Sequence, residues 1–231
     1  MKAIVLAGGF GTRLRERVPD LPKPMAPVAG RPFLEYVLDK LVLGGVSEII
    51  LSVGYKANII IEHFGDVYRN VAVSYAVEEE PLGTGGAIFH ALKGQGEEAT
   101  LVLNGDTFLD VDYRELILWY AQSPTQVAMV LREVPDVARY GSVLVSGEQV
   151  SSFVEKGKAG SGLINAGVYF INPGVFGTYS LSGKFELEAD LLQRHCRTLT
   201  PRAFISDTFF IDIGVPDDYD RAQHELPALL R

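Results

Sequence analysis

The sequence predicts an α/β fold in which a mostly parallel mixed sheet carries helices on both faces. In the first half, short runs rich in Val, Ile and Leu alternate with stretches whose apolar residues have helical spacing. Alternation of this kind implies right-handed crossovers between parallel strands. After about residue 124 the pattern changes to runs that are separated by short turns, with little helix between them.

In the first half, we expect buried strands at residues 3–6, 48–53, 71–77 and 100–103, and helices at 33–43, 55–64 and 86–92. Gly44 and Gly45 are suited to close the first long helix. Asp112, followed by Glu115, has the spacing of a capping box that opens a helix containing Trp119.

In the second half, we expect strands at residues 127–132, 142–145, 150–154 and 163–171. A helical piece follows at 186–194, then strands near 202–205 and 209–213, and a final helix from Pro216, where proline suits a first turn. No linker or internal repeat separates the halves. We therefore predict one domain over residues 1–231. The change of pattern near residue 124 then marks a boundary between two parts of this domain with different roles, and not a hinge between two domains.

Composition excludes several classes of protein. The 231 residues are 47% apolar and 22% charged, as in an ordinary folded protein, and the net charge of −8 argues against nucleic acid or an anionic membrane as the main partner. Cys196 is the only cysteine, so no disulfide can form within the chain. No apolar run is long enough for a signal-peptide core or a membrane span. We expect a cytoplasmic protein.

A glycine-rich turn directly follows the first predicted strand. Residues 6–14 read Leu-Ala-Gly-Gly-Phe-Gly-Thr-Arg-Leu, and the pair Lys23-Pro24 begins ten residues after Arg13. Glycines let backbone N–H groups approach a phosphate chain closely, and Arg13 and Lys23 supply the positive charge that a triphosphate requires. A dinucleotide-binding fingerprint needs glycine where Leu14 stands, and no P-loop Gly-Lys-Ser/Thr follows.

This turn resembles the glycine-rich loop of the sugar-1-phosphate nucleotidyltransferase family, and the resemblance extends over nearly the whole chain. It implies a Rossmann-like, three-layer fold of the glycosyltransferase-A-like type. In that family the loop wraps a nucleoside triphosphate, the arginine binds the outer phosphates, and the lysine holds phosphate at the reacting centre. The matching nucleotide-binding positions are Leu6, Gly8, Gly9, Gly11, Thr12, Arg13 and Lys23. Arg13, Lys23 and Asp106 are the expected catalytic residues.

Residues 78–86, Glu-Glu-Glu-Pro-Leu-Gly-Thr-Gly-Gly, resemble the segment with which the family recognises the base. A carboxylate can accept hydrogen bonds from guanine N1–H and N2–H together, which uracil and thymine cannot match. Glu78 is the candidate for this role, with Gly83 and Thr84 offering further contacts. The alternative is a solvated acidic turn, above all for Glu79 and Glu80.

Two aspartates lie where a metal ion could be held. Asp106 follows the fourth predicted strand, and ligands bind at the carboxyl ends of strands in open α/β sheets. Asp212 lies in an otherwise apolar strand, where a carboxylate is costly unless it is paired or bound to a cation. The resemblance implies that both bind Mg²⁺ against the α-phosphate. Alternatively, Asp106 caps a turn and Asp212 pairs with a buried arginine.

The family resemblance also implies a binding site for the sugar 1-phosphate. The matching positions are Tyr140, Gly141, Glu155, Lys156, Asn165 and Gly167. It implies that the glutamate binds sugar hydroxyls, the lysine binds the sugar phosphate, and the glycines allow close approach. Gly157 replaces the proline that usually follows the lysine, which puts the shape of this loop in question. Taken alone, Glu155 and Lys156 would be an exposed surface pair.

Within the family, residues 23–27, 83–87, 103–108, 140–143, 162–165 and 210–216 resemble the D-glycero-α-D-manno-heptose 1-phosphate guanylyltransferases. This resemblance implies GTP and a sugar 1-phosphate as substrates, GDP-heptose and pyrophosphate as products, and a task in bacterial surface glycan synthesis. The sequence does not decide whether two copies of the chain form a homodimer. The alternatives are a mannose-1-phosphate guanylyltransferase, a uridylyl- or thymidylyltransferase, or a non-catalytic nucleotide-sugar sensor. A sensor would be expected to lose one of the cations or aspartates that are retained here.

Overall fold

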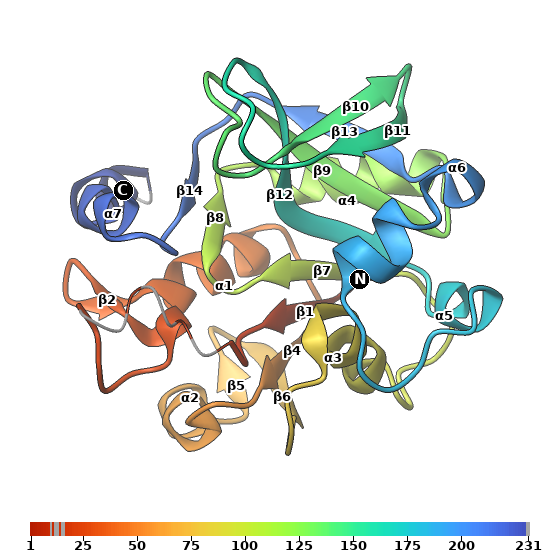
Figure 1. Cartoon of the computed structure of the whole chain (residues 1–231). Coiled ribbons are helices and arrows are strands. Elements are labelled where there is room, and N and C mark those ends of the chain that lie inside the picture. The colour runs from red at the N-terminus through yellow and green to blue at the C-terminus, as the bar shows by residue number, and fades with distance from the viewer. Residues whose placement is uncertain (10, 12–13, 15–16, 230–231) are drawn as a thin grey trace.

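The computed structural model describes residues 1–9, 11, 14 and 17–229 of the chain. In this part of the chain, one ten-stranded mixed sheet runs through the middle of the molecule, and two two-stranded sheets lie beside it (Figure 1). The expected α/β fold class is therefore confirmed.

Four parallel strands form the block that the sequence predicted for the first half. They are β1 (Lys2–Leu6), β4 (Glu48–Val53), β6 (Val71–Val77) and β7 (Thr100–Asn104). Their order is β7-β1-β4-β6, so β1 is central and Val5 lies between Leu51 and Leu103. Because all four strands run the same way, the segments that follow them meet at one edge of the sheet.

The second half continues the same sheet with mainly antiparallel pairs. Its strands are β9 (Val127–Val134), β10 (Ser142–Ser146), β11 (Gln149–Val154), β12 (Gly162–Ile171) and β13 (Arg202–Ser206). β12 lies between β7 and β9 and is antiparallel to both, whereas β13 runs parallel to β9. β12 thus joins the two halves into one sheet.

Helices cover both faces, which makes three layers. On one face lie α1 (Phe33–Leu43), α2 (Ala57–Phe64), α4 (Tyr113–Gln122) and α7 (Pro216–Leu229). On the other lie α3 (Gly83–Ala91), α5 (Gly174–Thr178), the π-helix η3 (Leu187–Gln193) and α6 (Cys196–Leu199).

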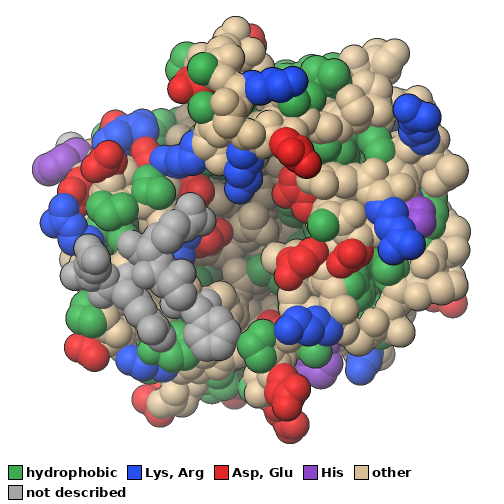
Figure 2. Space-filling view, in the orientation of Figure 1, with side chains coloured by type: hydrophobic (Ala, Val, Ile, Leu, Met, Phe, Trp, Pro, Cys, Tyr) green, Lys and Arg blue, Asp and Glu red, His purple; other side chains and the backbone are tan. Residues whose placement is uncertain are grey.

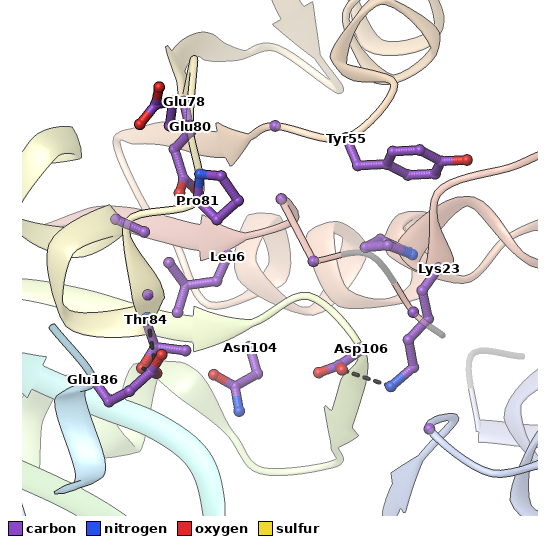
Figure 3. Close-up of a pocket in the computed structure, with 18 of the residues that line it drawn as sticks. Leu6, Lys23, Tyr55, Glu78, Glu80, Pro81, Thr84, Asn104, Asp106 and Glu186 are labelled. Carbon is purple, nitrogen blue, oxygen red and sulfur yellow. Dashed lines mark hydrogen bonds and ion pairs between the residues drawn. The ribbon is translucent and has the colours of Figure 1, made fainter. Parts of the chain in front are cut away.

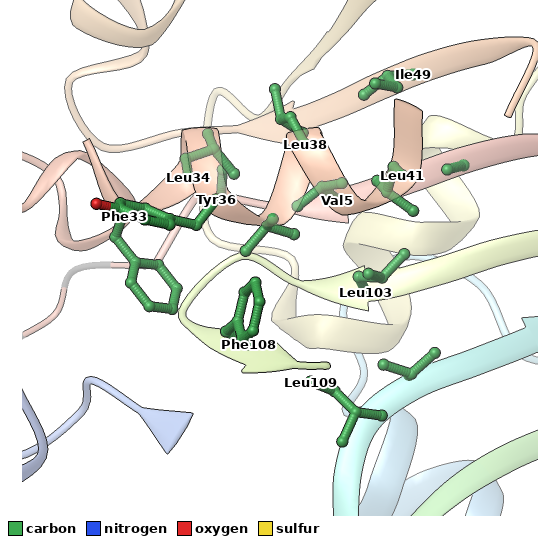
Figure 4. Close-up of a cluster of buried hydrophobic side chains, with 14 of the residues drawn as sticks. Val5, Phe33, Leu34, Tyr36, Leu38, Leu41, Ile49, Leu103, Phe108 and Leu109 are labelled. Carbon is green, nitrogen blue, oxygen red and sulfur yellow. The ribbon is translucent and has the colours of Figure 1, made fainter. Parts of the chain in front are cut away.

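Two apolar cores follow from the alternation of side chains along the central strands. On β1, Val5 belongs to the core under α1, whereas the preceding Ile4 belongs to the core under α3. Figure 4 shows the first of these cores, in which Leu38 and Leu41 of α1 lie over the sheet. Both faces of the parallel block are buried, which explains its continuous apolar sequence.

Short elements complete the fold. A 3-10 turn η2 (Lys23–Met25) precedes the hairpin of β2 (Pro27–Val28) and β3 (Arg31–Pro32), and β5 (Val67–Tyr68) borders the sheet next to β6. β8 (Thr107–Leu109) pairs antiparallel with β14 (Phe210–Asp212), so Asp212 lies opposite Thr107. This pairing brings a late segment of the chain to the end of β7.

Several predicted boundaries shift for local reasons. The α2 helix begins at Ala57 rather than at residue 55, because Lys56 has a left-handed φ of 52°. The α3 helix begins at Gly83, three residues before the predicted start. The Asp112 side chain accepts hydrogen bonds from the backbone N–H groups of Arg114 and Glu115, as an N-cap does. Among the described residues, no helix is both long and apolar enough to cross a membrane.

Candidate active site

A cleft of about 550 Å³ opens at the carboxyl ends of the four parallel strands. Figure 2 shows it as a central hollow, with acidic side chains along one wall and Lys and Arg side chains above it. The segments after β1, β4, β6 and β7 all contribute to its walls. The lining residues are Leu6, Gly8, Gly9, Gly11, Lys23, Pro24, Gly54, Tyr55, Glu78, Glu79, Glu80, Pro81, Gly83, Thr84, Ala87, Asn104, Asp106, Glu186 and Gly214.

Of the described glycines in the turn after β1, Gly8 and Gly11 pack against other groups of the cleft, whereas a Cβ on Gly9 would meet nothing within 4 Å. A Cβ atom on Gly8 would lie 2.8 Å from Glu78 Oε1, and one on Gly11, whose φ is +56°, would lie 2.7 Å from Lys23 Cβ. A larger residue at either position would therefore displace a predicted substrate contact. Thr12 and Arg13, which the sequence also assigned to this site, lie outside the described residues.

Lys23 and two aspartates form the charged centre of the cleft. The ammonium Nζ of Lys23 lies 2.6 Å from Asp106 Oδ2 and 3.5 Å from Asp212 Oδ1 (Figure 3 shows the first of these pairs). Only 9% of the Lys23 side chain is exposed. Because the three groups come from η2, the end of β7 and β14, this site depends on the β8–β14 pairing.

Backbone hydrogen bonds orient the Asp212 carboxylate and join its segment to the main chain of Asp106. The backbone N–H of Gly214 donates to Asp212 Oδ1 at 2.7 Å, and the N–H of Ile213 donates to the carbonyl oxygen of Asp106 at 3.1 Å. A Cβ on Gly214 would lie 2.9 Å from Lys23 Nζ, so this glycine leaves room for the ammonium. Lys23 is thus a partner of both carboxylates, and Asp212 pairs with this lysine where the alternative interpretation expected an arginine.

The residues present fit a divalent cation only if substrate completes its coordination. The two carboxylates converge on a single cationic group, as ligands of one metal ion would. In the described part of the chain, no group of three or more His, Cys, Asp and Glu side chains could hold a metal ion. Mg²⁺ usually takes one or two carboxylates together with phosphate oxygens and water, so the pair suits a Mg²⁺–phosphate complex.

Glu78 lies on the opposite wall of the cleft, at the end of β6. The Ser52 hydroxyl donates to its Oε1 at 3.2 Å, and the backbone N–H of Leu82 donates to its Oε2 at 3.2 Å. Both oxygens are therefore fixed, and each retains a lone pair for a further donor. Its neighbours Glu79 and Glu80 also line the cleft but are exposed.

Glu186 lines the cleft, although the sequence did not single it out as a site residue. Its carboxylate Oε2 accepts hydrogen bonds from the backbone N–H of Thr84, at 3.2 Å, and from the Thr84 hydroxyl, at 3.0 Å (Figure 3). The α3 helix has no side-chain cap at Leu82, so Glu186 satisfies an N–H of its first turn. Thr84 and Glu186 are 102 residues apart, and no local pattern links them.

The predicted sugar residues surround the turn before β10 and the end of β11. Gly141 has a φ of +78°, and a Cβ there would lie 2.7 Å from the carbonyl oxygen of Val154 and 3.6 Å from the backbone nitrogen of Lys156. The fold therefore brings Tyr140 and Gly141 next to Glu155 and Lys156. Burial raises the pKa of the Tyr140 hydroxyl, and the charges of nearby carboxylates add to this rise. Glu155 and Lys156 are both exposed.

Asn165 and Gly167 lie on β12, beside the end of β7. The Asn165 side-chain amide donates to the Tyr169 hydroxyl at 2.7 Å, and its oxygen accepts from the N–H of Gly167 at 3.1 Å. Gly167 has a φ of +73°, and a Cβ there would lie 2.6 Å from the amide nitrogen of Asn104, which lines the cleft. This part of β12 therefore packs against the cleft wall.

The sequence pattern of the family described as "Nucleotidyl transferase" matches residues 2–228. The chain belongs to the nucleotidyl transferase family. The family resemblance and the enzyme class expected from the sequence are thereby confirmed.

Among nucleotidyl transferases, the chain is similar to two proteins named D-glycero-α-D-manno-heptose 1-phosphate guanylyltransferase. It is 43% identical to that of Aneurinibacillus thermoaerophilus, covering 98% of each chain. It is 44% identical to that of Campylobacter jejuni, covering 95% of this chain and 97% of the relative. It also resembles the crystal structure of HddC from Yersinia pseudotuberculosis, at 40% identity and a TM-score of 0.86, covering 97% of this chain and 98% of that one. HddC complexed with GMP-PN gives a TM-score of 0.85.

Proposed function

We propose that this enzyme transfers GMP from GTP to D-glycero-α-D-manno-heptose 1-phosphate, giving GDP-heptose and pyrophosphate for bacterial surface glycan synthesis. The observation that carries the proposal is the convergence of Lys23, Asp106 and Asp212 at one end of a cleft. A fixed carboxylate, Glu78, lines the same cleft. The names of two similar proteins, and the GMP-PN ligand of the similar HddC, support guanine and heptose.

The reaction needs no covalent intermediate. A phosphate oxygen of the sugar 1-phosphate forms a bond to the α-phosphorus of GTP, and the bond between that phosphorus and the leaving oxygen of pyrophosphate breaks in line. The attacking phosphate is already ionised at neutral pH, so no general base is required. Catalysis is then positioning together with neutralisation of charge.

Lys23 is the cation that we assign to the reacting centre, and Arg13 and Thr12 are proposed to bind the outer phosphates together with the N–H groups of the glycine turn. Asp106 and Asp212 would hold Mg²⁺, which would supply positive charge at the α-phosphate. A bound phosphate would offer Lys23 a further anionic partner beside the two carboxylates.

Glu78 is proposed to select the base. Guanine presents N1–H and N2–H side by side, and both can donate to one carboxylate. Ser52 and the Leu82 N–H fix the Glu78 oxygens before the base binds. The Glu78 side chain therefore loses little conformational entropy on binding. Uracil and thymine have only one ring N–H donor and cannot present two adjacent donors to this carboxylate, and a site that is built for a hydrogen bond rejects ligands that lack it, often by about 10⁴-fold. Gly83 and Thr84 lie beside it in the cleft and are proposed to add contacts to the nucleotide.

The sugar 1-phosphate is proposed to bind on the side of the second half. There we assign the phosphate to Lys156 and the sugar hydroxyls to Glu155 and Asn165. The glycines at 141 and 167, with Tyr140, would shape the surface against which the sugar lies. Since GTP is a cytosolic metabolite, we propose that the reaction takes place in the cytoplasm.

The proposal is tested by measuring pyrophosphate release with GTP, UTP, CTP and dTTP, each with several sugar 1-phosphates. GTP with the heptose 1-phosphate should give the highest kcat/KM. Mannose 1-phosphate shares the ring stereochemistry and lacks one hydroxymethylene, so it should be used roughly 10- to 200-fold less well. Equal or better use of mannose 1-phosphate would instead identify a mannose-1-phosphate guanylyltransferase. A preference for UTP or dTTP would reject the role of Glu78.

A further inference from the structure

A buried aspartate of the last helix forms ion pairs with two arginines. Asp218 lies in the first turn of α7 and is only 8% exposed. Its Oδ2 lies 2.5 Å from Nη2 of Arg139, and its Oδ1 lies 2.9 Å from Nη1 of Arg221. A buried carboxylate is costly unless it is paired, so this position requires its arginine partners.

The two arginines differ in what else they contact. Arg221 also pairs with Glu225 at 3.0 Å, within α7 and on the surface. The Arg139 guanidinium instead lies over the ring of Tyr140, 4.4 Å from its centre, and contacts the Tyr140 hydroxyl. Arg139 therefore connects α7 to the turn that carries Tyr140.

Tyr140 continues this connection toward the charged centre. Its ring meets the ring of Phe210 edge to face, with centroids 6.1 Å apart. Phe210 begins the short strand β14, in which Asp212 is the last residue. Asp218, Arg139, Tyr140 and Phe210 thus form a continuous set of contacts between α7 and the strand of a proposed metal ligand.

The turn of Tyr140 and Gly141 is also held against the loop that carries Lys156, the residue proposed to bind the sugar phosphate. The N–H groups of Tyr140 and Gly141 both donate to the carbonyl oxygen of Val137, at 3.0 and 2.9 Å, and the N–H of Gly157 donates to the carbonyl oxygen of Ala138 at 2.9 Å. The residue after Lys156 is therefore bonded to the residue before Arg139. A movement of Arg139 would move the loop of Lys156.

The charges agree with this arrangement. Burial lowers the pKa of Arg139, but the hydrogen bond that Arg139 donates to Asp218 and the charges of Asp218 and Asp212 raise it by more, so the net direction is upward. The upward direction agrees with the ion pair between Arg139 and Asp218.

We propose that Asp218 is a positioning residue for the sugar phosphate: by holding Arg139 against Tyr140, it sets the Tyr140–Gly141 turn and the adjoining loop of Lys156. The inference rests on the proposed function, because it takes that turn and that loop to bind the sugar 1-phosphate. It adds a residue of the final helix, which itself does not touch substrate.

The test measures the KM for heptose 1-phosphate and for GTP separately in three variants of the full chain. Asp218→Asn keeps the shape of the side chain and removes its charge. Arg139→Lys keeps the positive charge and removes the planar group that both pairs and stacks. Arg221→Gln is the matched control, since it removes the other arginine of Asp218 without touching the turn. Thermal unfolding is followed for all three.

For Asp218→Asn and Arg139→Lys we expect the KM for heptose 1-phosphate to rise on the order of 10-fold while the KM for GTP changes less than 2-fold. Arg221→Gln should lower Tm at most and leave both KM values unchanged. If Asp218→Asn does not fold, Arg139→Lys decides. A lower Tm with an unchanged sugar-phosphate KM, or an equal rise in both KM values, would overturn the inference.

The wild-type chain separates this inference from the proposed function. If it released no pyrophosphate with GTP and any sugar 1-phosphate, the proposed function would be wrong and the inference would fall with it. An active wild type whose sugar-phosphate KM does not respond to Arg139→Lys or Asp218→Asn would overturn the inference alone.

Discussion

The two halves of the proposed active site are built in different ways. In the nucleotide half, the charged groups are held by other groups of the protein: Lys23 lies between two carboxylates, and Glu78 accepts two hydrogen bonds. In the sugar half, Glu155 and Lys156 follow an antiparallel strand and are exposed. Parallel strands bring their ends to one edge, where polar groups can hold each other, whereas the turns of a hairpin present theirs to solvent. We therefore expect substitutions among the groups around Lys23 and Glu78, which include Asp212 from the second half of the chain, to affect the chemical step most. Substitutions at Glu155 and Lys156 should affect affinity.

The largest effect should come from the pair Asp106 and Asp212. Replacing either with Asn, or adding excess chelator, should lower kcat by about 10³-fold or more, because charge at the α-phosphate is then no longer neutralised. Steady-state pyrophosphate release with added Mg²⁺ measures this. Asp110→Asn is the control, since Asp110 pairs with Lys40 and does not line the cleft. Full turnover in chelator would remove the metal from the mechanism.

A smaller, base-specific effect is expected for Glu78→Gln. The variant loses the charged acceptor for N1–H and N2–H, which is worth about 2–3 kcal/mol, so kcat/KM for GTP should fall by roughly 30- to 150-fold. The value for UTP should change little, and the ratio of the two values is the measurement. Glu79→Gln, at the exposed neighbour, should leave that ratio within 3-fold. An unchanged ratio in Glu78→Gln would show that another group selects the base.

In the sugar half we expect a change of affinity. Lys156→Ala should raise the KM for the sugar 1-phosphate by about 10- to 100-fold, as for one hydrogen bond to a charged group, with a smaller effect on GTP. Arg13→Ala should weaken the binding of GTP more than that of the sugar 1-phosphate. Titration calorimetry with each ligand gives the two affinities, and Lys158→Ala, at another exposed lysine, is the control. If Lys156→Ala weakened GTP binding as much as Arg13→Ala does, the two halves would not divide the substrates as proposed.

The smallest effect concerns the contact between the halves. Glu186→Ala removes the acceptor for Thr84 at the start of α3 and should lower the free energy of unfolding by about 1 kcal/mol, as the loss of a helix cap does. For a chain of this size, that corresponds to a fall in Tm of about 2–4 °C. Calorimetric melting measures it, with Lys184→Ala as the control at an exposed neighbour. A Tm equal to that of the control would mean that the Thr84–Glu186 contact does not contribute to stability.

The sequence predicted the nucleotide half better than the sugar half. The strands of the parallel block are buried on both faces, so their apolar runs are distinct, and residues after three of the four runs were expected at the cleft. Gly54 and Tyr55, which follow the run at 48–53, also line the cleft but were not expected there. Contacts between distant segments leave no such pattern. The Thr84–Glu186 contact and the bridging of two aspartates by Lys23 depend on strand order, which propensity and spacing do not encode. The π-helical form of η3 likewise follows from packing and was predicted only as a helical piece.

The position of β12 between β7 and β9 has a consequence for synthesis on the ribosome. Residues 1–104 contain all four strands of the parallel block, which can associate as soon as they emerge. The edge of β7, however, stays unpaired until β12 has been released, some 60 residues later. An uncovered apolar strand is a site for wrong pairing with another nascent chain. The interval between these two strands is therefore the stage of translation at which this protein is most exposed to aggregation.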